Sequence, residues 1–265
     1  MRHHLSPIAM LVLLGLTSVA CAYQPVRVEL TDEDETGQRA FMDVHLPSEP
    51  NGTVVLICPG GGYGGLAWGA EGDGIATWLR SHGIAGAALN YRLPKGRHSV
   101  PLADAQRAMR EPHRMAGELK FKRIGVMGFS AGGHLAATVA TQSKNKNERP
   151  DFAVLIYPVI TMGDQTHRGS RRNLLGETPS TAMIEQFSNH LQVTPETCPT
   201  FLAHAVDDKP VPPIHSQLFY DACRKHGVPS VYLRLPDGGH GLNGYKGDSW
   251  DKWQSESLKW ISDLP

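Results

Sequence analysis

The sequence predicts an α/β fold in which a mostly parallel sheet is covered by helices on both faces. Short β-rich runs alternate with helical patterns along most of the chain, as in folds built from βαβ units. The runs at 53–58 and 152–157 are continuously apolar, which is typical of strands buried on both faces in the middle of a sheet. The 265 residues suffice for one large domain or two small ones with a substantial hydrophobic core.

The expected strands are rich in β-branched and apolar residues and are bounded by turn-forming residues. They span 26–30, 42–46, 53–58, 84–90, 123–128, 152–157, 200–205 and 230–235. The expected helices have apolar residues at helical spacing and span 73–81, 103–119, 133–141, 215–226 and 249–262. The polar segment 160–196 breaks the alternation, apart from a helical patch at 183–187. We interpret it as an insertion over the carboxyl edge of the sheet and not as a second domain.

The first 22 residues form a separate unit. A basic start at Arg2 precedes an apolar run at 8–19, and Ala20 and Ala22 provide an A-x-A cleavage site. The run is shorter than the roughly 20 residues that a membrane-spanning helix requires, so we predict a secretory signal peptide cleaved near Ala22. Lipidation of Cys21 is the less favoured alternative, because Ser18 stands where lipoprotein signals usually have leucine. Residues 23–265 are therefore predicted to form one exported domain without stable membrane insertion.

Charge and cysteine content exclude several classes of protein. Lysine and arginine number 26, as do aspartate and glutamate, so the formal net charge is zero and nothing indicates a nucleic-acid partner. Cleavage after Ala22 leaves Cys58, Cys198 and Cys223, an odd number at wide spacing. Export would permit one disulfide among them, but three widely spaced cysteines are no disulfide framework, so we favour small buried hydrophobic residues. Nothing in the sequence specifies an oligomeric state.

Residues 128–133, Gly-Phe-Ser-Ala-Gly-Gly, connect an expected strand directly to an expected helix. A serine between two glycines at such a turn is typical of a nucleophile elbow, which holds the serine in a strained backbone conformation. Gly128 and Gly132 would relieve crowding on either side of Ser130. The start of a helix also offers free N–H groups that favour negative charge. The alternative, a glycine-rich turn without chemistry, predicts no partner residues downstream.

A second glycine-rich loop, 58–65, follows the strand at 53–58. Its glycines match the dinucleotide-binding pattern G-x-G-x-x-G, but the next strand ends in Asn-Tyr-Arg at 90–92, without the acidic residue that would hold a ribose. We favour an oxyanion hole, in which Gly61 or Gly62 and Ala131 donate backbone N–H groups to a developing oxyanion. Such a donor typically contributes about 3 kcal/mol to lowering the barrier.

Two later loops supply an acid and a base. A serine nucleophile needs a general base, and the base needs an acid to orient it. In folds with a nucleophile elbow these residues follow in the chain order Ser, Asp, His. Ser130, Asp208 and His240 have that order, and each follows an expected strand. We favour Asp208 as the acid and keep Asp207 as the alternative, since both follow the strand at 200–205.

Other polar residues near these motifs receive weaker interpretations. His134, one turn after Ser130, is expected to have a packing or capping role. Tyr63, Trp68 and Glu71 are predicted to contact substrate, although packing in the core is an equal alternative. The histidines show no metal-ligand spacing, so we predict neither a metal site nor a cofactor.

Several long motifs, in order, resemble one known group of proteins. They are CPGGGYGGLAWGAEG, NYRLP, PLADAQRAMR, RIGVMGFSAGGHLAATVAT, PTFLAHAVDDKPVP and DGGHG. From about residue 53 to the C terminus, the chain resembles the bacterial esterase branch of the α/β-hydrolase fold. That branch includes acetyl xylan esterases, feruloyl-esterase-like proteins and relatives of dienelactone hydrolase.

The resemblance implies an α/β-hydrolase fold in which Ser130, Asp208 and His240 form the triad and the glycine loop forms the oxyanion site. Two departures are visible. Segment 110–123 lacks the tryptophan-glycine-acidic turn that such proteins commonly carry, which we interpret as a shorter surface loop. Dienelactone hydrolases have a cysteine nucleophile, so Ser130 argues against their reaction.

The sequence therefore predicts an exported serine esterase that acts on small-molecule or polysaccharide esters, with acetyl groups on xylan-type carbohydrate favoured. A general short-chain carboxylesterase, a lipase or a feruloyl esterase would differ only in the substrate pocket. The polar segment 160–196 argues against a lipase with an apolar lid. A prolyl-oligopeptidase-type peptidase would carry a further propeller domain. A binding protein with the hydrolase fold would be expected to lack a triad residue, and none is missing.

Overall fold

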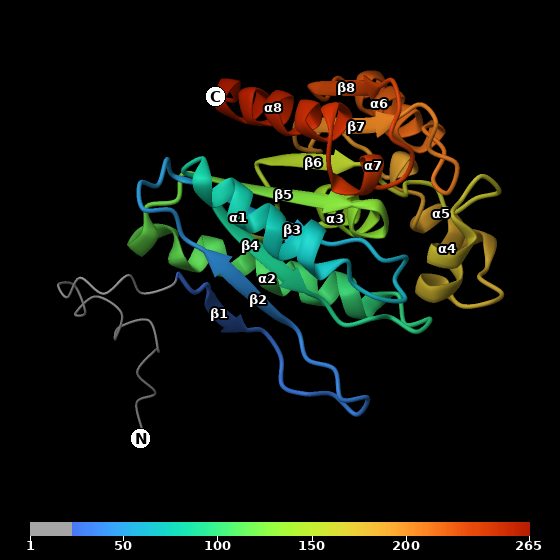
Figure 1. The fold of residues 1–265 in the computed structure, drawn as a ribbon. Helices are drawn as coiled ribbons and strands as arrows, with labels where there is room; N and C mark the ends of the chain where they lie inside the picture. Colours follow the sequence, from blue (N-terminus) through green and yellow to red (C-terminus); the bar gives the residue numbers. More distant parts are fainter. Residues whose placement is uncertain (1–22) are drawn as a thin grey trace.

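The computed structural model describes residues 23–265, which contain one eight-stranded sheet (Figure 1). Its strands are β1 (Val26–Glu29), β2 (Phe41–His45), β3 (Thr53–Cys58), β4 (Ala85–Asn90), β5 (Arg123–Phe129), β6 (Phe152–Ile156), β7 (Thr200–Ala205) and β8 (Ser230–Leu235). Across the sheet they lie in the order β1-β2-β4-β3-β5-β6-β7-β8. β2 pairs antiparallel with β1 and β4, and the other neighbouring strands are parallel. The predicted mostly parallel sheet is confirmed.

Helices cover both faces of the sheet (Figure 1). On one face lie α1 (Gly74–Ser81) and α8 (Asp248–Asp263), and on the other lie α2 (Ser99–Leu119), α3 (Ser130–Gln142) and α6 (Ile214–Lys225). β3 shows how the sequence builds both cores, because successive side chains of a strand point to opposite faces. Val54 and Leu56 belong to one core, and Val55 and Ile57 to the other. This strand is buried on both faces, as its apolar run predicts.

The structure contains every strand and helix that the sequence predicts, but two helices begin earlier than expected. α2 begins at Ser99, because Pro101 is tolerated in a first helical turn. α3 begins at Ser130, although Gly132 and Gly133 follow in its first turn and glycine disfavours helix. The shorter elements have too few turns to produce a clear periodic pattern. They are η2 (Trp68–Asp73), η3 (Lys146–Glu148), α4 (Arg168–Leu175), α5 (Thr181–Gln186), η4 (Asn189–Leu191) and α7 (Leu242–Tyr245).

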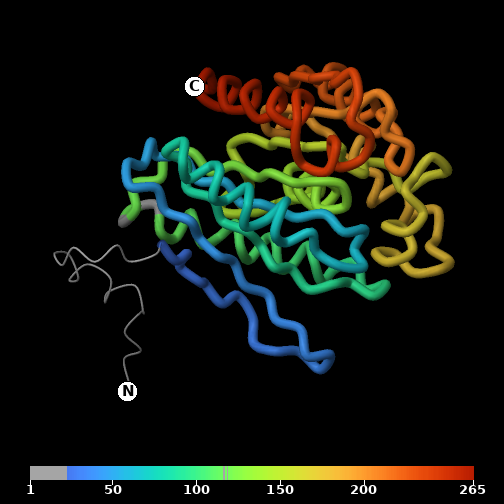
Figure 2. The backbone as a smooth tube through the Cα atoms, viewed as in Figure 1, coloured from blue at the N-terminus to red at the C-terminus, as the bar shows by residue number. Residues whose placement is uncertain are grey.

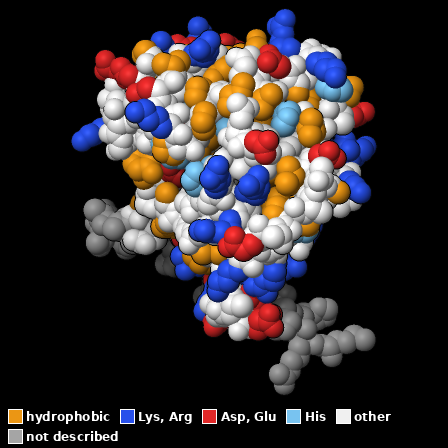
Figure 3. Space-filling view, turned by 90° about the vertical axis from the view of Figure 1, so that its right-hand side faces the viewer, with side chains coloured by type: hydrophobic (Ala, Val, Ile, Leu, Met, Phe, Trp, Pro, Cys, Tyr) orange, Lys and Arg blue, Asp and Glu red, His pale blue; other side chains and the backbone are white. Residues whose placement is uncertain are grey.

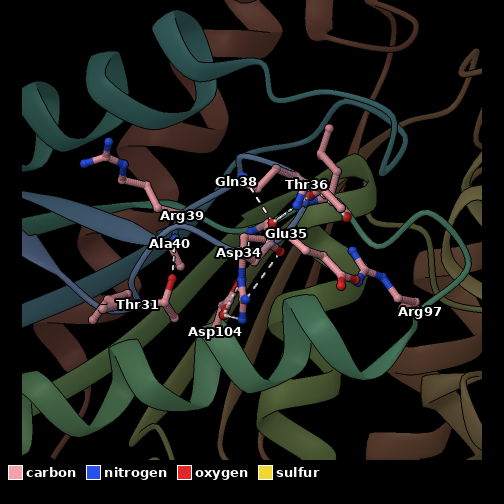
Figure 4. Close-up of polar contacts among 12 residues, drawn as sticks. Thr31, Asp34, Glu35, Thr36, Gln38, Arg39, Ala40, Arg97 and Asp104 are labelled. Carbon is pink, nitrogen blue, oxygen red and sulfur yellow. Dashed lines mark hydrogen bonds and ion pairs between the residues drawn. The ribbon is translucent and has the colours of Figure 1, made fainter.

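The connection between β1 and β2, residues 30–40, extends beyond the sheet (Figure 2). The Asp34 carboxylate accepts hydrogen bonds from the backbone N–H groups of Thr36 (2.8 Å) and Gln38 (3.2 Å) (Figure 4). It also lies 3.6 Å from Arg92. Arg92, just after β4, also pairs with the buried Asp104 of α2 at 2.7 Å. This network fixes the connection against the carboxyl end of β4.

The predictions for the N-terminal segment and the cysteines have different outcomes. The predicted signal peptide, residues 1–22, lies outside the described residues, so cleavage near Ala22 and lipidation of Cys21 stay predictions. Between residues 23 and 265, no helix combines the length and the apolar character that crossing a bilayer requires. Cys58, Cys198 and Cys223 are unpaired and buried, as predicted, and burial raises the pKa of the Cys223 thiol to about 12.

Candidate active site

The turn between β5 and α3 places Ser130 at the carboxyl edge of the sheet. Ser130 has a φ of +52°, in the left-handed region that is costly for residues other than glycine. A Cβ atom at Gly128 would lie 2.2 Å from the carbonyl oxygen of Gly132, and one at Gly132 would lie 2.1 Å from that of Cys58. Glycine is therefore required where β3, β5 and α3 converge. The structure has the strained turn that the sequence predicts.

Three of the predicted site residues form a continuous chain of hydrogen bonds. The Ser130 hydroxyl lies 2.9 Å from His240 Nε2, and His240 Nδ1 lies 2.7 Å from Asp208 Oδ2. Because a carboxylate can only accept, Nδ1 carries the proton and Nε2 is free to accept the Ser130 hydroxyl proton. The Ser130 residue is 7% exposed and the His240 side chain 27% exposed, so this chain of groups opens to solvent mainly at the histidine.

Asp208 is buried and accepts several hydrogen bonds. Its Oδ1 accepts from the Val211 N–H at 2.9 Å, and its Oδ2 lies 3.2 Å from Nε2 of the buried His204. Burial raises the pKa of Asp208, but hydrogen bonds from His204 and His240 outweigh this effect and lower the pKa to about 2. Asp207 instead accepts from the Gly239 N–H at 2.9 Å. The structure thus brings Asp208 to His240 and uses Asp207 to hold the adjacent backbone.

The glycine loop after β3 lies directly beside Ser130. A Cβ atom at Gly60 would be 3.0 Å from the Ser130 Cβ. The following Gly61 and Gly62 have φ values of +123° and +64°, and their N–H groups donate to no acceptor within the described residues. Ala131 lies in the first turn of α3, where backbone N–H groups have no intrahelical partner. All three predicted oxyanion donors thus belong to segments beside Ser130.

Contacts from other elements fix the position of the glycine loop. The Tyr91 hydroxyl donates to the Pro59 carbonyl at 2.7 Å, and the Asn173 side chain donates to the Gly62 carbonyl at 2.9 Å. Asn173 belongs to α4, so segment 160–196 contacts the carboxyl edge of the sheet beside Ser130. Tyr91 lies in the motif after β4 that lacks a ribose-binding acid, and its role here is to anchor the loop.

The structure corrects two predicted substrate contacts. Tyr63 is 2% exposed and donates to His134 Nδ1 at 2.9 Å, and Glu71 is 3% exposed with its carboxylate bound by protein donors. Both side chains face the protein interior, which argues against the substrate contacts predicted for them. Trp68 is only partly buried and packs on Phe41 with ring centroids 5.7 Å apart, so its contact with substrate stays a prediction.

His134 has the packing role expected from the sequence. It is buried, and its Nε2 donates to the Phe187 carbonyl at 2.7 Å while its Nδ1 accepts from Tyr63. Burial lowers the pKa of His134 to about 4, which keeps the ring neutral near pH 7.

Three further side chains lie at the site, and the sequence does not predict them there. The Tyr157 ring lies edge-on to His240 with centroids 5.0 Å apart. His204 supports Asp208 from within β7, and its Nδ1 accepts from the Ser216 hydroxyl at 2.8 Å. His167 precedes α4, and a Cβ atom at Gly62 would lie 3.7 Å from its ring. Tyr157 directly follows a strand that ends at this edge, which is the one signal that could have identified it.

Comparisons with known proteins agree with this architecture. Residues 42–223 match the family model BD-FAE. The chain is 32% identical to the acetylxylan esterase of Xylanibacter ruminicola, over 96% of this chain and 54% of that protein. It is 33% identical to endo-1,4-beta-xylanase B of Butyrivibrio fibrisolvens, over 75% of this chain and 34% of that protein. The chain thus spans about half or less of the length of these curated relatives.

Solved structures show the same fold along nearly their whole length. The acetyl ester-xyloside bifunctional hydrolase of Caldicellulosiruptor lactoaceticus superposes with a TM-score of 0.82 and 34% identity, covering 90% of this chain and 96% of that one. A carboxylesterase of Lactobacillus plantarum superposes with a TM-score of 0.76 and 26% identity, covering 91% of this chain and 98% of that one. The chain belongs to the BD-FAE family, within the α/β-hydrolase superfamily.

Proposed function

We propose that this protein is a serine esterase in which Ser130, His240 and Asp208 form the catalytic triad. The observation that carries the proposal is the unbroken chain of hydrogen bonds from the Ser130 hydroxyl through His240 to a buried, ionised Asp208. A serine hydroxyl becomes a nucleophile when a neighbouring base takes its proton, and this base is held by an acid. The names of two relatives, an acetylxylan esterase and a carboxylesterase, support the same reaction class.

The acylation step follows from these contacts. Ser130 Oγ attacks the ester carbonyl carbon while His240 Nε2 takes the hydroxyl proton, and Asp208 stabilises the imidazolium that results. Backbone N–H groups of Gly61 or Gly62 and of Ala131 donate to the carbonyl oxygen as it becomes negative. The carbon–oxygen bond to the alcohol then breaks, and His240 gives its proton to the leaving alcohol.

The deacylation step uses the same groups in the reverse order. His240 takes a proton from a water molecule, and the resulting hydroxide attacks the acyl carbon held on Ser130. The bond from that carbon to Ser130 Oγ breaks, the serine recovers its proton from His240, and the carboxylic acid leaves.

We infer acetyl groups on xylan-type carbohydrate as the substrate class. The names of three relatives support this inference: an acetylxylan esterase, a xylanase and an acetyl ester-xyloside hydrolase. Figure 3 views the carboxyl edge of the sheet, where apolar, basic, acidic and histidine side chains are intermixed. A surface of this kind suits a polar polymer better than a lipid. Export, proposed from residues 1–22, would bring the enzyme to a polymer outside the cell.

A general short-chain carboxylesterase is the second candidate, favoured by the similarity to the Lactobacillus plantarum carboxylesterase. Rates on acetylated xylan, a feruloylated sugar and acyl esters of increasing chain length separate the candidates. The carbohydrate-ester proposal expects the highest kcat/KM on acetylated xylan. Equal or higher values on simple esters would favour the general carboxylesterase, and a preference for long acyl chains would exclude both.

The test of the triad itself is Ser130→Ala with p-nitrophenyl acetate as the reporter. Removal of the nucleophile should lower kcat by about a millionfold, as in serine hydrolases with an intact base and acid. The variant should remain folded, because the alanine Cβ occupies the same space as the serine Cβ. Retention of most of the activity would remove Ser130 from the mechanism.

A further inference from the structure

Glu71 is a buried carboxylate beside the site to which the proposed mechanism gives no role. It lies in the π-helical turn η2 and is 3% exposed. Its Oε2 accepts from the backbone N–H of Gly60 at 2.7 Å, and its Oε1 accepts from the Tyr157 hydroxyl at 2.9 Å. Burying a carboxylate is costly unless donors satisfy it, so a carboxylate kept here needs an explanation.

Both donors belong to segments that hold the reacting groups. Gly60 directly precedes the proposed oxyanion donors, and its Cα lies against Ser130, since a Cβ added there would be 3.0 Å from the serine Cβ. Tyr157 presents its ring edge-on to His240, with centroids 5.0 Å apart. A single carboxylate therefore connects the glycine loop after β3 to the aromatic ring that packs on the histidine after β8.

We propose that Glu71 is a positioning residue that fixes the oxyanion loop relative to His240 by accepting one hydrogen bond from each side. The inference rests on the proposed esterase function. Glu71 cannot touch substrate, because its carboxylate is enclosed by protein donors. Its effect is exerted through Gly60 on one side of the reacting ester and through Tyr157 on the other. Displacements of about 1 Å in such groups can reduce rates by about a hundredfold.

The hydrogen bonds at Glu71 oppose the effect of burial on its carboxylate. Burial raises the pKa of Glu71, and the Gly60 N–H and the Tyr157 and Tyr245 hydroxyls oppose that increase, as does the charge of His240. Glutamine could keep both contacts, because its oxygen can accept from Gly60 and its NH₂ group can donate to the Tyr157 oxygen. Alanine would remove both contacts. This difference makes the pair Glu71→Gln and Glu71→Ala informative.

The experiment measures kcat and KM for p-nitrophenyl acetate, normalised to the folded fraction from near-ultraviolet circular dichroism. Glu71→Ala should lower kcat by about a hundredfold with KM changed less than about threefold. Glu71→Gln should recover kcat to within about tenfold of the wild type. Tyr157→Phe, which keeps the ring against His240 and removes only its hydroxyl, should lower kcat about tenfold with KM unchanged.

Two controls make the outcome decisive. Glu148→Ala removes another buried carboxylate, one that accepts from Asn145 at 2.9 Å and pairs with Arg110, away from the site. It should reduce stability without reducing kcat. Ser130→Ala tests the esterase mechanism itself. If Ser130→Ala is inactive while Glu71→Ala keeps kcat within threefold, or while the glutamine variant is no better than alanine, the positioning role fails and the esterase proposal stands. If Glu71→Ala does not fold, unchanged kcat in Tyr157→Phe would overturn the role.

Discussion

Ser130 and His240 meet at one hydrogen bond, yet the segments that carry them are held in place by different interactions. The elbow, residues 128–133, is fixed by close backbone packing, since added Cβ atoms at Gly128 and Gly132 would overlap carbonyl oxygens. The histidine loop, residues 236–241, is partly exposed, and an added Cβ at Gly239 would meet no atom within 4 Å. Hydrogen bonds to Asp207 and Asp208 hold this loop instead.

This difference indicates how each half of the site should respond to mutation. Packing against backbone leaves no room for relaxation, so changes in the elbow should affect stability and activity together. The histidine loop is partly exposed and has room to relax, so changes within residues 236–241 should affect global stability less, although the hydrogen bonds of this loop determine the geometry of the base. Changes there should reduce activity more than stability. Four predictions test the contrast, in order of decreasing effect.

Of these four changes, replacement of Asp208 should give the largest loss of activity, although a smaller one than that of Ser130→Ala. Asp208→Asn removes the charge that orients His240, and kcat should fall about 10⁴-fold, as for the corresponding change in a serine-protease triad. Asp207→Asn, the matched control, alters only the contact with Gly239 and should lower kcat less than tenfold. The measurement is turnover of p-nitrophenyl acetate by both variants in parallel. A larger loss for the Asp207 variant would assign the acid role to Asp207.

Gly132→Ala should give the largest loss of stability. The added Cβ would lie 2.1 Å and 2.3 Å from the carbonyl oxygens of Cys58 and Pro59, so β3 or α3 must move. The free energy of unfolding should fall by at least about 3 kcal/mol, with activity falling in parallel. Gly117→Ala, in α2, meets no atom within 4 Å and should be neutral or stabilising by about 0.5–1 kcal/mol. Equal denaturant midpoints for the two variants would refute the packing argument.

Acid titration should show two groups next to these regions in separate pH windows: His134, in the helix that continues the elbow, and Asp208, which holds the histidine loop. His134, in α3, has its pKa lowered to about 4 by burial, so the unfolded chain binds the extra proton. Its contribution to stability is complete above pH 6.5 and is lost as the pH falls from 6.5 through 4, on the order of 3 kcal/mol.

Asp208 titrates in a more acidic window. Its pKa of about 2 in the folded protein means that its contribution, on the order of 2 kcal/mol, is present above pH 4 and is lost as the pH falls from about 4 through 2. Denaturant unfolding at intervals from pH 7 to below pH 2 measures both windows. His134→Gln should reduce the slope in the first window, to which His215, with its pKa also lowered to about 4 by burial, contributes as well. Asp208→Asn should reduce the slope in the second. If both variants kept the wild-type slope, these groups would not account for acid sensitivity.

Gly239→Ala should produce the smallest effect. Gly239 has a φ of +56°, and open space surrounds the position of a Cβ. The cost is therefore only that of holding alanine in the left-handed region, about 1–2 kcal/mol. The kcat for p-nitrophenyl acetate should fall less than tenfold, because Asp207 and Asp208 still hold the loop. A loss of stability as large as that of Gly132→Ala would contradict the contrast between the two segments.

The sequence predicts the strands, the helices and the grouping of Ser130, Asp208 and His240 because each depends on a local pattern. Apolar runs identify the strands, and parallel strands bring their carboxyl ends to one edge, where residues after them must gather. The choice between Asp207 and Asp208 depends on one turn after β7, where a difference of one residue reverses the direction of the side chain. Local patterns do not resolve a turn at that level.

The misassigned and missed residues depend on contacts between distant segments. Glu71 follows the glycine loop, which suggests contact with substrate, but the irregular turn η2 directs it inward to Gly60 and Tyr157. Tyr157 has a φ of +38°, a conformation that its sequence context gives no reason to expect. His204, the fifth of the six residues of β7, contacts Asp208 four residues later, in the turn after the strand. The contacts of Glu71 and Tyr157 require the assembled sheet, and that of His204 requires the turn after β7.

The π-helical turn η2 also limits how the chain can change in length. Its wider turn is closed by the Gly74 N–H donating to the Gly69 carbonyl, five residues earlier. In an α-helix each residue advances the side-chain direction by about 100°. Deleting Gly72 or Asp73, which lie between Glu71 and α1, would therefore turn Glu71 by about that angle relative to α1, away from both of its donors. Most loops absorb insertions and deletions, but the stretch from Glu71 to α1 cannot, because its register sets the direction of a buried charge.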